Sequence, residues 1–187
     1  MSRLFAVMLC VGTLCAAAES YAQARLRQHG RATIEFSDRA IKAVAQYDYS
    51  QKNHDGPWLL IDIAVQARER IAINRDQLYL WTPDNRRVPL ATQEQFLEAG
   101  NDMRQLLQNA SVLRRPFGNY FTTPVQETVQ FFAFPGTIVH DSVVTNRDQV
   151  AAGPLFFKYR EGNWPAGKYT LIVNHEKARA ELPITLE

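Results

Sequence analysis

The chain has 187 residues and a formal net charge of +2 at neutral pH. A charge this small does not indicate a protein that binds nucleic acid. Both cysteines, Cys10 and Cys15, lie near the N-terminus, so residues 25–187 can form no disulfide and contain no thiol nucleophile.

The first 24 residues have the pattern of a secretory signal peptide. Arg3 provides a positive charge, residues 4–18 form an apolar run, and Ala22-Gln23-Ala24 is a small-residue cleavage signal. The run is shorter than the roughly 20 apolar residues that a membrane-spanning helix needs, and no later stretch reaches that length. We therefore expect cleavage near Ala24 and a periplasmic or secreted protein without a transmembrane span.

Lipid attachment at Cys15 is the alternative use of this segment. Leu14 disfavours it, because a small residue is expected directly before a cysteine that carries a lipid. Cleavage therefore remains our prediction. Residues 25–187 are long enough to bury a core and are expected to form a single domain.

Most of the remaining sequence alternates apolar and polar residues with a period of two, which is typical of β-strands with one buried face. Polar clusters rich in Asn, Asp, Gly and Pro separate these segments and indicate turns. Many short strands joined by polar turns predict a mainly β protein, an antiparallel β-sandwich. In chain order, strands are expected at residues 31–36, 58–65, 71–73, 78–80, 129–134, 155–159, 168–173 and 178–186.

Residues 92–113 are the one long stretch with helical periodicity, and they predict a helical insertion in the sandwich. Thr92 and Gln95 fit a capping box at its start. Gly100 costs about 1 kcal/mol inside a helix, so a break there is the alternative to one continuous helix. An apolar stripe recurs every three or four residues, at Phe96, Gly100, Met103, Leu107 and Ala110.

The strand expected over residues 129–134 has apolar residues on both faces. Val129 and Phe131 share one face, and Phe132 and Phe134 share the other. A strand of this kind needs cover on both faces. We expect the sandwich interior to cover one face and the helical insertion to cover the other.

The two C-terminal strands carry the most specific pattern. In Trp164-Pro165-Ala166-Gly167-Lys168-Tyr169-Thr170-Leu171, a Gly-x-Tyr-x-Leu step enters the penultimate strand, and a hairpin turn and the last strand follow. This pattern resembles the tyrosine corner of immunoglobulin-like β-sandwiches, a group that includes exported bacterial modules. The resemblance implies an immunoglobulin-like fold in which the Tyr169 hydroxyl bonds a main-chain group a few residues upstream. It implies no activity.

The segment that follows the helix combines basic and aromatic residues without a clear period. Arginine and aromatic residues are enriched at the centres of protein interfaces. The alternative is that the two phenylalanines only anchor the insertion to the sandwich. We predict a partner-binding surface formed by Arg114, Arg115, Phe117, Tyr120 and Phe121.

The sequence contains no recognisable motif for catalysis or cofactor binding. It has no Gly-x-Ser-x-Gly elbow, and its four histidines lack the close spacing of a zinc site. We therefore name no catalytic residue, no metal ligand and no cofactor. The competing hypothesis is a metal-dependent enzyme or metal-binding protein in which His54 and Asp55 meet His140 and Asp141.

These observations favour an exported, non-enzymatic β-sandwich that binds a protein or a cell-envelope partner through the segment after the helix. The sequence does not define the partner or the oligomeric state. A further alternative is that an exposed edge strand pairs with another chain in an assembly.

Overall fold

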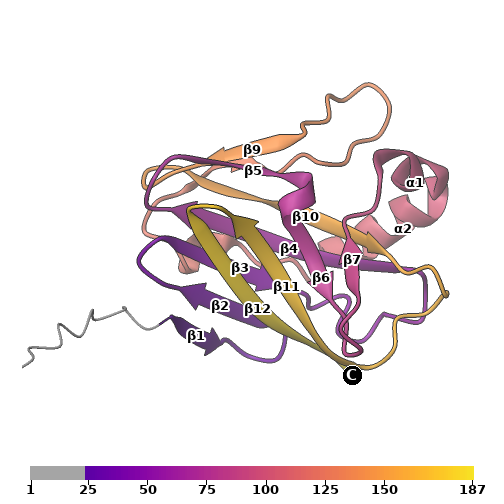
Figure 1. The fold of residues 1–187 in the computed structure, drawn as a ribbon. Coiled ribbons are helices and arrows are strands. Elements are labelled where there is room, and N and C mark those ends of the chain that lie inside the picture. Colours follow the sequence, from indigo (N-terminus) through magenta and orange to yellow (C-terminus); the bar gives the residue numbers. More distant parts are fainter. Residues whose placement is uncertain (1–23) are drawn as a thin grey trace, which may run out of the picture.

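The computed structural model describes residues 24–187, so the predicted signal peptide lies outside the described residues except for Ala24. The described chain forms a β-sandwich with a helical insertion, as predicted (Figure 1). The larger sheet has six strands in the order β1-β2-β3-β4-β10-β8. Their bounds are β1 Arg25–Gln28, β2 Thr33–Ser37, β3 Ile41–Gln46, β4 Trp58–Ala67, β10 Val150–Lys158 and β8 Val125–Thr128.

A four-stranded sheet in the order β12-β11-β6-β7 packs against the inner face of the larger sheet, and β5 and β9 form a separate pair. Strand β8 runs parallel to β10, which departs from the purely antiparallel sandwich that was expected. The 3₁₀ helices are η1, Arg75–Gln77, and η2, Phe117–Asn119. The remaining strands are β5 Ile71–Asn74, β6 Leu78–Trp81, β7 Arg87–Pro89, β9 Ser142–Thr145, β11 Gly167–His175 and β12 Ala178–Leu186.

The alternating pattern places one side of each sheet in a shared core. Leu59 and Ile61 of β4 are fully buried, and β12 alternates buried and exposed residues along its whole length. Fully burying one large apolar side chain contributes about 1.5 to 3 kcal/mol, so this interior provides much of the folding free energy. The Tyr169 hydroxyl donates to the main-chain oxygen of Pro165 at 2.7 Å, which is the hydrogen bond that the C-terminal motif implies.

The helical insertion is broken in two, as the alternative prediction allowed. Helix α1 spans Gln93–Glu98 and helix α2 spans Gly100–Ser111. The Thr92 hydroxyl accepts the main-chain N–H of Gln95 at 3.1 Å, and the Gln95 side chain bonds back to the N–H of Thr92. Gly100 has a φ of 49°, a left-handed conformation that glycine adopts at little cost, so the helix breaks at this residue.

The insertion covers the outer face of the six-stranded sheet, the face turned away from the four-stranded sheet. Strand alternation places Leu60 and Phe156 on this outer face. The Phe96 ring of α1 packs against the Phe156 ring, with centroids 5.2 Å apart. Met103 and Ala110 of α2 are buried in the same hydrophobic cluster. The sheet is therefore buried on both faces where the helices lie.

Residues 129–134 do not form a strand, so that assignment was wrong. Strand β8 ends at Thr128, and the chain then runs irregularly. Phe132 and Phe134 nevertheless pack against Phe96, with ring centroids 5.5 Å and 5.1 Å apart, so the predicted cover by the helical insertion is confirmed. An irregular segment that is buried on both sides has the same apolar composition as a strand that is buried on both faces. The run of apolar residues at 129–134 was therefore assigned to a strand.

Candidate functional site

Residues 112–124, here called the exit segment, lead from α2 across the outer face of the six-stranded sheet. That face consists of rows of side chains paired across neighbouring strands. Along β3 and β4 the successive rows are Lys42 with Gln66, Val44 with Ala64, and Gln46 with Asp62. Polar and apolar rows therefore alternate beneath the exit segment.

Phe121 anchors the exit segment to the sheet. Its side chain is 7% exposed and forms a hydrophobic cluster with Val44, Ala64 and Val150. Phe117 and Tyr120 pack partly against the same cluster and are half-buried. The anchoring role offered as the alternative therefore accounts for Phe121, whose ring is not accessible to a partner in this conformation.

Arg114 and Arg115 are exposed, and each is held by a carboxylate. The Arg114 guanidinium forms two contacts with the Asp62 carboxylate, Nε to Oδ2 at 3.2 Å and Nη2 to Oδ1 at 3.1 Å. Nη2 of Arg115 lies 2.6 Å from Oδ1 of Asp48. The side chains of Arg114 and Arg115 remain 39% and 55% exposed. Both guanidinium groups thus have an acidic partner and one side open to solvent.

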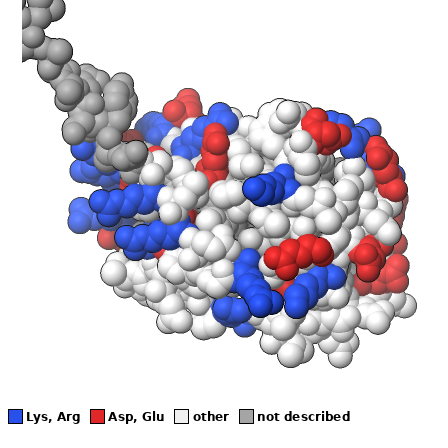
Figure 2. Space-filling model, turned by 90° about the horizontal axis from the view of Figure 1, so that it is seen from below, with Lys and Arg blue, Asp and Glu red and all other residues white. Residues whose placement is uncertain are grey.

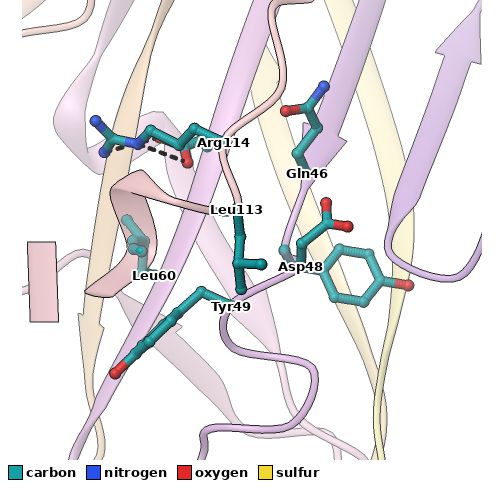
Figure 3. Close-up of a pocket in the computed structure, with 9 residues that line it drawn as sticks. Gln46, Asp48, Tyr49, Leu60, Leu113 and Arg114 are labelled. Carbon is teal, nitrogen blue, oxygen red and sulfur yellow. Dashed lines mark hydrogen bonds and ion pairs between the residues drawn. The ribbon is translucent and has the colours of Figure 1, made fainter. Parts of the chain in front are cut away.

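A small cavity lies beside Leu113 and Arg114, with Gln46 and Asp48 among the residues around it (Figure 3). Its volume is about 10 Å³. Gln46 is 4% exposed, and its Nε2 has no hydrogen-bond partner within the described residues. A cavity of this size holds about one water molecule, which would satisfy Gln46, and it is too small for an organic substrate.

Asp62 lines this cavity together with Asp48. Burial raises the pKa of Asp62, the charge of Arg114 and its hydrogen bond lower it, and repulsion by Asp48 raises it further, so that the pKa is raised overall. A raised carboxyl pKa beside an arginine occurs in some acid–base sites. The cavity leaves no room for a substrate beside Asp62, so the arrangement supports a structural role for the Asp62–Arg114 pair.

A second charge network ties the far end of the exit segment to β2 and β3. Oε2 of Glu35 lies 2.8 Å from Nε2 of His29, and its Oε1 lies 3.1 Å from Nζ of Lys42. Lys42 also donates to the main-chain oxygen of Tyr120. Burial would raise the pKa of Glu35, but the bonds to His29 and Lys42 outweigh it and the pKa is lowered. Glu35 is therefore held ionised as a partner for Lys42.

Two apolar side chains that the sequence analysis did not select are the most exposed large hydrophobic residues of the exit segment. Val112 is 84% exposed and Leu113 is 45% exposed. Val112 follows Ala110 by two positions and so lies off the apolar stripe, which is the signal by which sequence reasoning could have found it. We call Val112, Leu113, Arg114 and Arg115 the exit surface.

His54 and His140 lie in different surroundings. His54 is buried, and its ring nitrogens lie 2.7 Å and 2.8 Å from the main-chain oxygens of Trp164 and Glu187. His140 and Asp141 are exposed in the segment before β9. Within residues 24–187, no group of three or more His, Cys, Asp or Glu side chains is arranged to hold a metal ion. The competing metal hypothesis gains no support from these positions.

The long edge strand that the strand-addition alternative requires is β12, which pairs only with β11. The N–H of Thr185 points to this edge, where it donates to the Tyr47 hydroxyl at 3.4 Å. Pro183, two residues earlier on the same edge, has no N–H. Arg179 and Glu181 form an ion pair at 2.9 Å on the same strand. Proline and charge at an edge oppose pairing with another chain, so these features count against strand addition at β12.

No family model, curated protein or solved structure matches the chain at a significant level. In the part of the chain that the structure describes, no helix is long and apolar enough to span a membrane.

Proposed function

We propose that the chain is an exported, non-enzymatic β-sandwich module that binds a protein or a cell-envelope partner through the exit surface. The observation that carries this proposal is the exposed pair Val112 and Leu113 beside Arg114 and Arg115. Exposed apolar side chains with polar neighbours mark interaction sites, and arginine is enriched at interface centres. The predicted signal peptide supplies the route of export.

The acidic partners of the two arginines also favour binding. Asp62 and Asp48 hold the guanidinium groups before any partner arrives. Immobilising a flexible side chain on binding costs about 0.5 to 1.5 kcal/mol, and prior fixation reduces that cost. A partner therefore meets two exposed apolar side chains followed by two arginines that carboxylates already engage.

We further infer that the sandwich is of the immunoglobulin-like, tyrosine-corner kind. The hydrogen bond from Tyr169 to Pro165 at 2.7 Å and the β11–β12 hairpin support this inference. It concerns the fold alone, because one fold hosts many functions.

The proposal is tested by placing charge on the exit surface. Val112→Glu combined with Leu113→Glu should weaken partner binding by about tenfold or more, since burying a carboxylate in an apolar contact is unfavourable. The measurement is in-cell cross-linking followed by quantification of the species joined to the protein. Ile138→Glu is the matched control, because Ile138 is an apolar residue that is 75% exposed outside the exit segment. The control should leave cross-linking unchanged.

Two outcomes would contradict the proposal. Undiminished cross-linking of a folded double variant would show that the exit surface does not bind the partner. Separately, N-terminal sequencing of the protein isolated from its native cells should begin at Arg25, and a retained N-terminal segment would contradict cleavage at Ala24.

A further inference from the structure

Lysine and arginine side chains gather at the left end of the molecule (Figure 2), the end at which the β2–β3 and β4–β5 turns lie in Figure 1. Turns joining β2 to β3 and β9 to β10 meet the end of β4 and the exit segment around an open groove of about 430 Å³. We call it the basic groove. Its four basic side chains come from three places in the sequence and are Arg39 and Lys42, Arg68, and Arg147.

Three of these cations have no partner in the described residues. Arg39, Arg68 and Arg147 are exposed, and within residues 24–187 their guanidinium groups form no ion pair. Lys42 is not free in this way, because its Nζ forms an ion pair with Oε1 of Glu35 at 3.1 Å. The groove therefore presents three guanidinium groups with free N–H donors.

The polar residues between the arginines fix the walls of the groove and add donors. Nε2 of Gln66 donates to the main-chain oxygen of Arg147 at 2.7 Å and to Oγ1 of Thr123 at 3.1 Å. Because Thr123 accepts a hydrogen bond from Gln66, its own hydroxyl hydrogen remains to be donated. Thr122 contributes a second hydroxyl to the lining. These contacts bind the β9–β10 turn and the exit segment to β4.

Two carboxylates, Asp38 and Asp148, also line the groove. Oδ1 of Asp38 accepts the main-chain N–H groups of Ala40 and Ile41 at 2.8 Å and 2.7 Å, so this oxygen is used within its own turn. Because Glu35 neutralises Lys42, the three arginines stand against two acidic groups, and the lining keeps a net charge of +1. The balance of charge and of hydrogen-bond donors therefore favours an anion.

A larger groove of about 600 Å³ lies at the opposite end of the molecule. Two of the arginines that line it have partners within the chain. There Arg86 pairs with Asp84 at 2.6 Å and with Glu161 at 2.8 Å. Arg87 donates to the main-chain oxygen of Asp76 and lies over the Tyr79 ring. Intramolecular partners thus engage these two arginines, and of the basic side chains in this second groove only Arg160 has no ion pair, side-chain hydrogen bond or cation–π contact within the described residues, whereas three such arginines line the basic groove.

We propose that the basic groove binds the phosphate of an anionic lipid headgroup. Guanidinium groups match phosphate oxygens with paired N–H donors, and the threonine hydroxyls extend the set. The groove is larger than one phosphate ion and open to solvent, so it leaves room for the rest of a headgroup beside the phosphate. The predicted export brings such headgroups within reach. The inference does not depend on the exit surface.

The test compares binding of the purified protein to phosphatidylcholine vesicles with and without phosphatidylglycerol. The protein should bind only the anionic vesicles. Arg39→Gln combined with Arg147→Gln should weaken that binding about 25-fold, because one basic residue near an anionic surface contributes about 1 kcal/mol, or roughly fivefold. Inorganic phosphate, titrated in a separate arm, should bind far more weakly than the vesicles.

Arg160→Gln is the matched control. Arg160 is exposed and lies beyond the other end of the nine-residue strand β10, about 30 Å from the basic groove at roughly 3.3 Å per residue. This exceeds the screening length of about 8 Å at physiological salt, so the control should bind within about twofold of the original protein. Unchanged thermal melting shows that each variant folds.

Three outcomes would overturn the proposal. Absence of binding to the anionic vesicles would exclude the lipid headgroup. A loss of about fivefold in the Arg160→Gln control, the same as expected for each groove arginine, would show that net charge, not the groove, attracts the vesicles. Saturable binding of inorganic phosphate without vesicle binding would identify a free anion as the ligand.

Discussion

At the scale of single residues, His54 shows how one side chain holds two distant segments together. Its ring nitrogens lie 2.7 Å from the main-chain oxygen of Trp164 and 2.8 Å from that of Glu187. A neutral imidazole has one N–H, whereas the imidazolium has two and satisfies both oxygens. The bond to Glu187 raises the pKa of His54, burial lowers it, and the bond to Trp164 and the charge of Asp55 raise it, so that the pKa is raised overall.

This geometry predicts a pH-dependent contribution to stability. Because the folded-state pKa of His54 is raised, its contribution is fully present below the unfolded value of about 6.5 and is lost as pH rises through the folded-state pKa. His54→Gln should lower the free energy of unfolding by about 1.5 to 3 kcal/mol below that pH, the range for a hydrogen bond to a charged group. Urea unfolding at several pH values measures this difference.

The control for this prediction is His140→Gln, since His140 is exposed. The control should leave the pH profile of stability unchanged. A His54→Gln protein that lost equal stability at every pH would show that folding does not shift the pKa of His54, and the imidazolium account would be wrong.

At the scale of secondary-structure elements, sequence patterns predicted most where one face of a strand is buried. Strand β12 has the bounds expected from its alternation, and β4 begins where expected. Strand β3 was missed because Phe121 of the exit segment covers its outer face and removes the alternation, leaving Ala43, Val44 and Ala45 all buried. Periodicity reports a strand only when its two faces differ in exposure.

The candidate site was predicted in part, for a related reason. The sequence showed that basic and aromatic residues collect after α2, but composition does not tell which of them point inward. Phe121 is buried because Val44, Ala64 and Val150, far away in the chain, form an apolar patch beneath it. Val112 is exposed because α2 ends at Ser111. The burial of Phe121 therefore depends on tertiary packing, which local patterns do not contain, whereas the position of Val112 off the apolar stripe can be read from the sequence.

The capping box of α1 gives a prediction at this same scale. The Thr92 hydroxyl accepts the N–H of Gln95 at 3.1 Å and so satisfies a helix N–H that would otherwise lack a partner. Thr92→Ala should lower the free energy of unfolding by about 1 kcal/mol. Denaturant unfolding measures it, and Thr137→Ala, at an exposed loop position, is the control. Equal stability of the Thr92→Ala protein would mean that the cap contributes nothing.

At the scale of the whole molecule, the insertion shares one core with the sandwich. Phe96 and Met103 belong to the same buried cluster as Leu171 of the four-stranded sheet. The insertion therefore should not unfold alone, because opening it would expose Leu60 and Phe156 on the sheet beneath.

Native-state hydrogen exchange tests this cooperativity. Central amides of α2, such as that of Met103, should exchange with the same opening free energy as amides of β11, such as that of Leu171. The first turn of α1 serves as the internal control, since helix ends fray at lower cost. A much smaller opening free energy at Met103 would show that the insertion is a separate folding unit.

The buried ring of Phe121 also separates the exit surface from the part of the exit segment that lines the basic groove. Val112 to Arg115 lie on one side of it in the chain, and Thr122 and Thr123 at the basic groove lie directly on the other. The Phe121 ring packs against Val44, Ala64 and Val150 and cannot shift without opening a cavity. A backbone displacement at one end of the exit segment is therefore not transmitted past Phe121 to the other end. Two ligands held at the two ends of one segment should therefore bind independently, with a coupling free energy near zero.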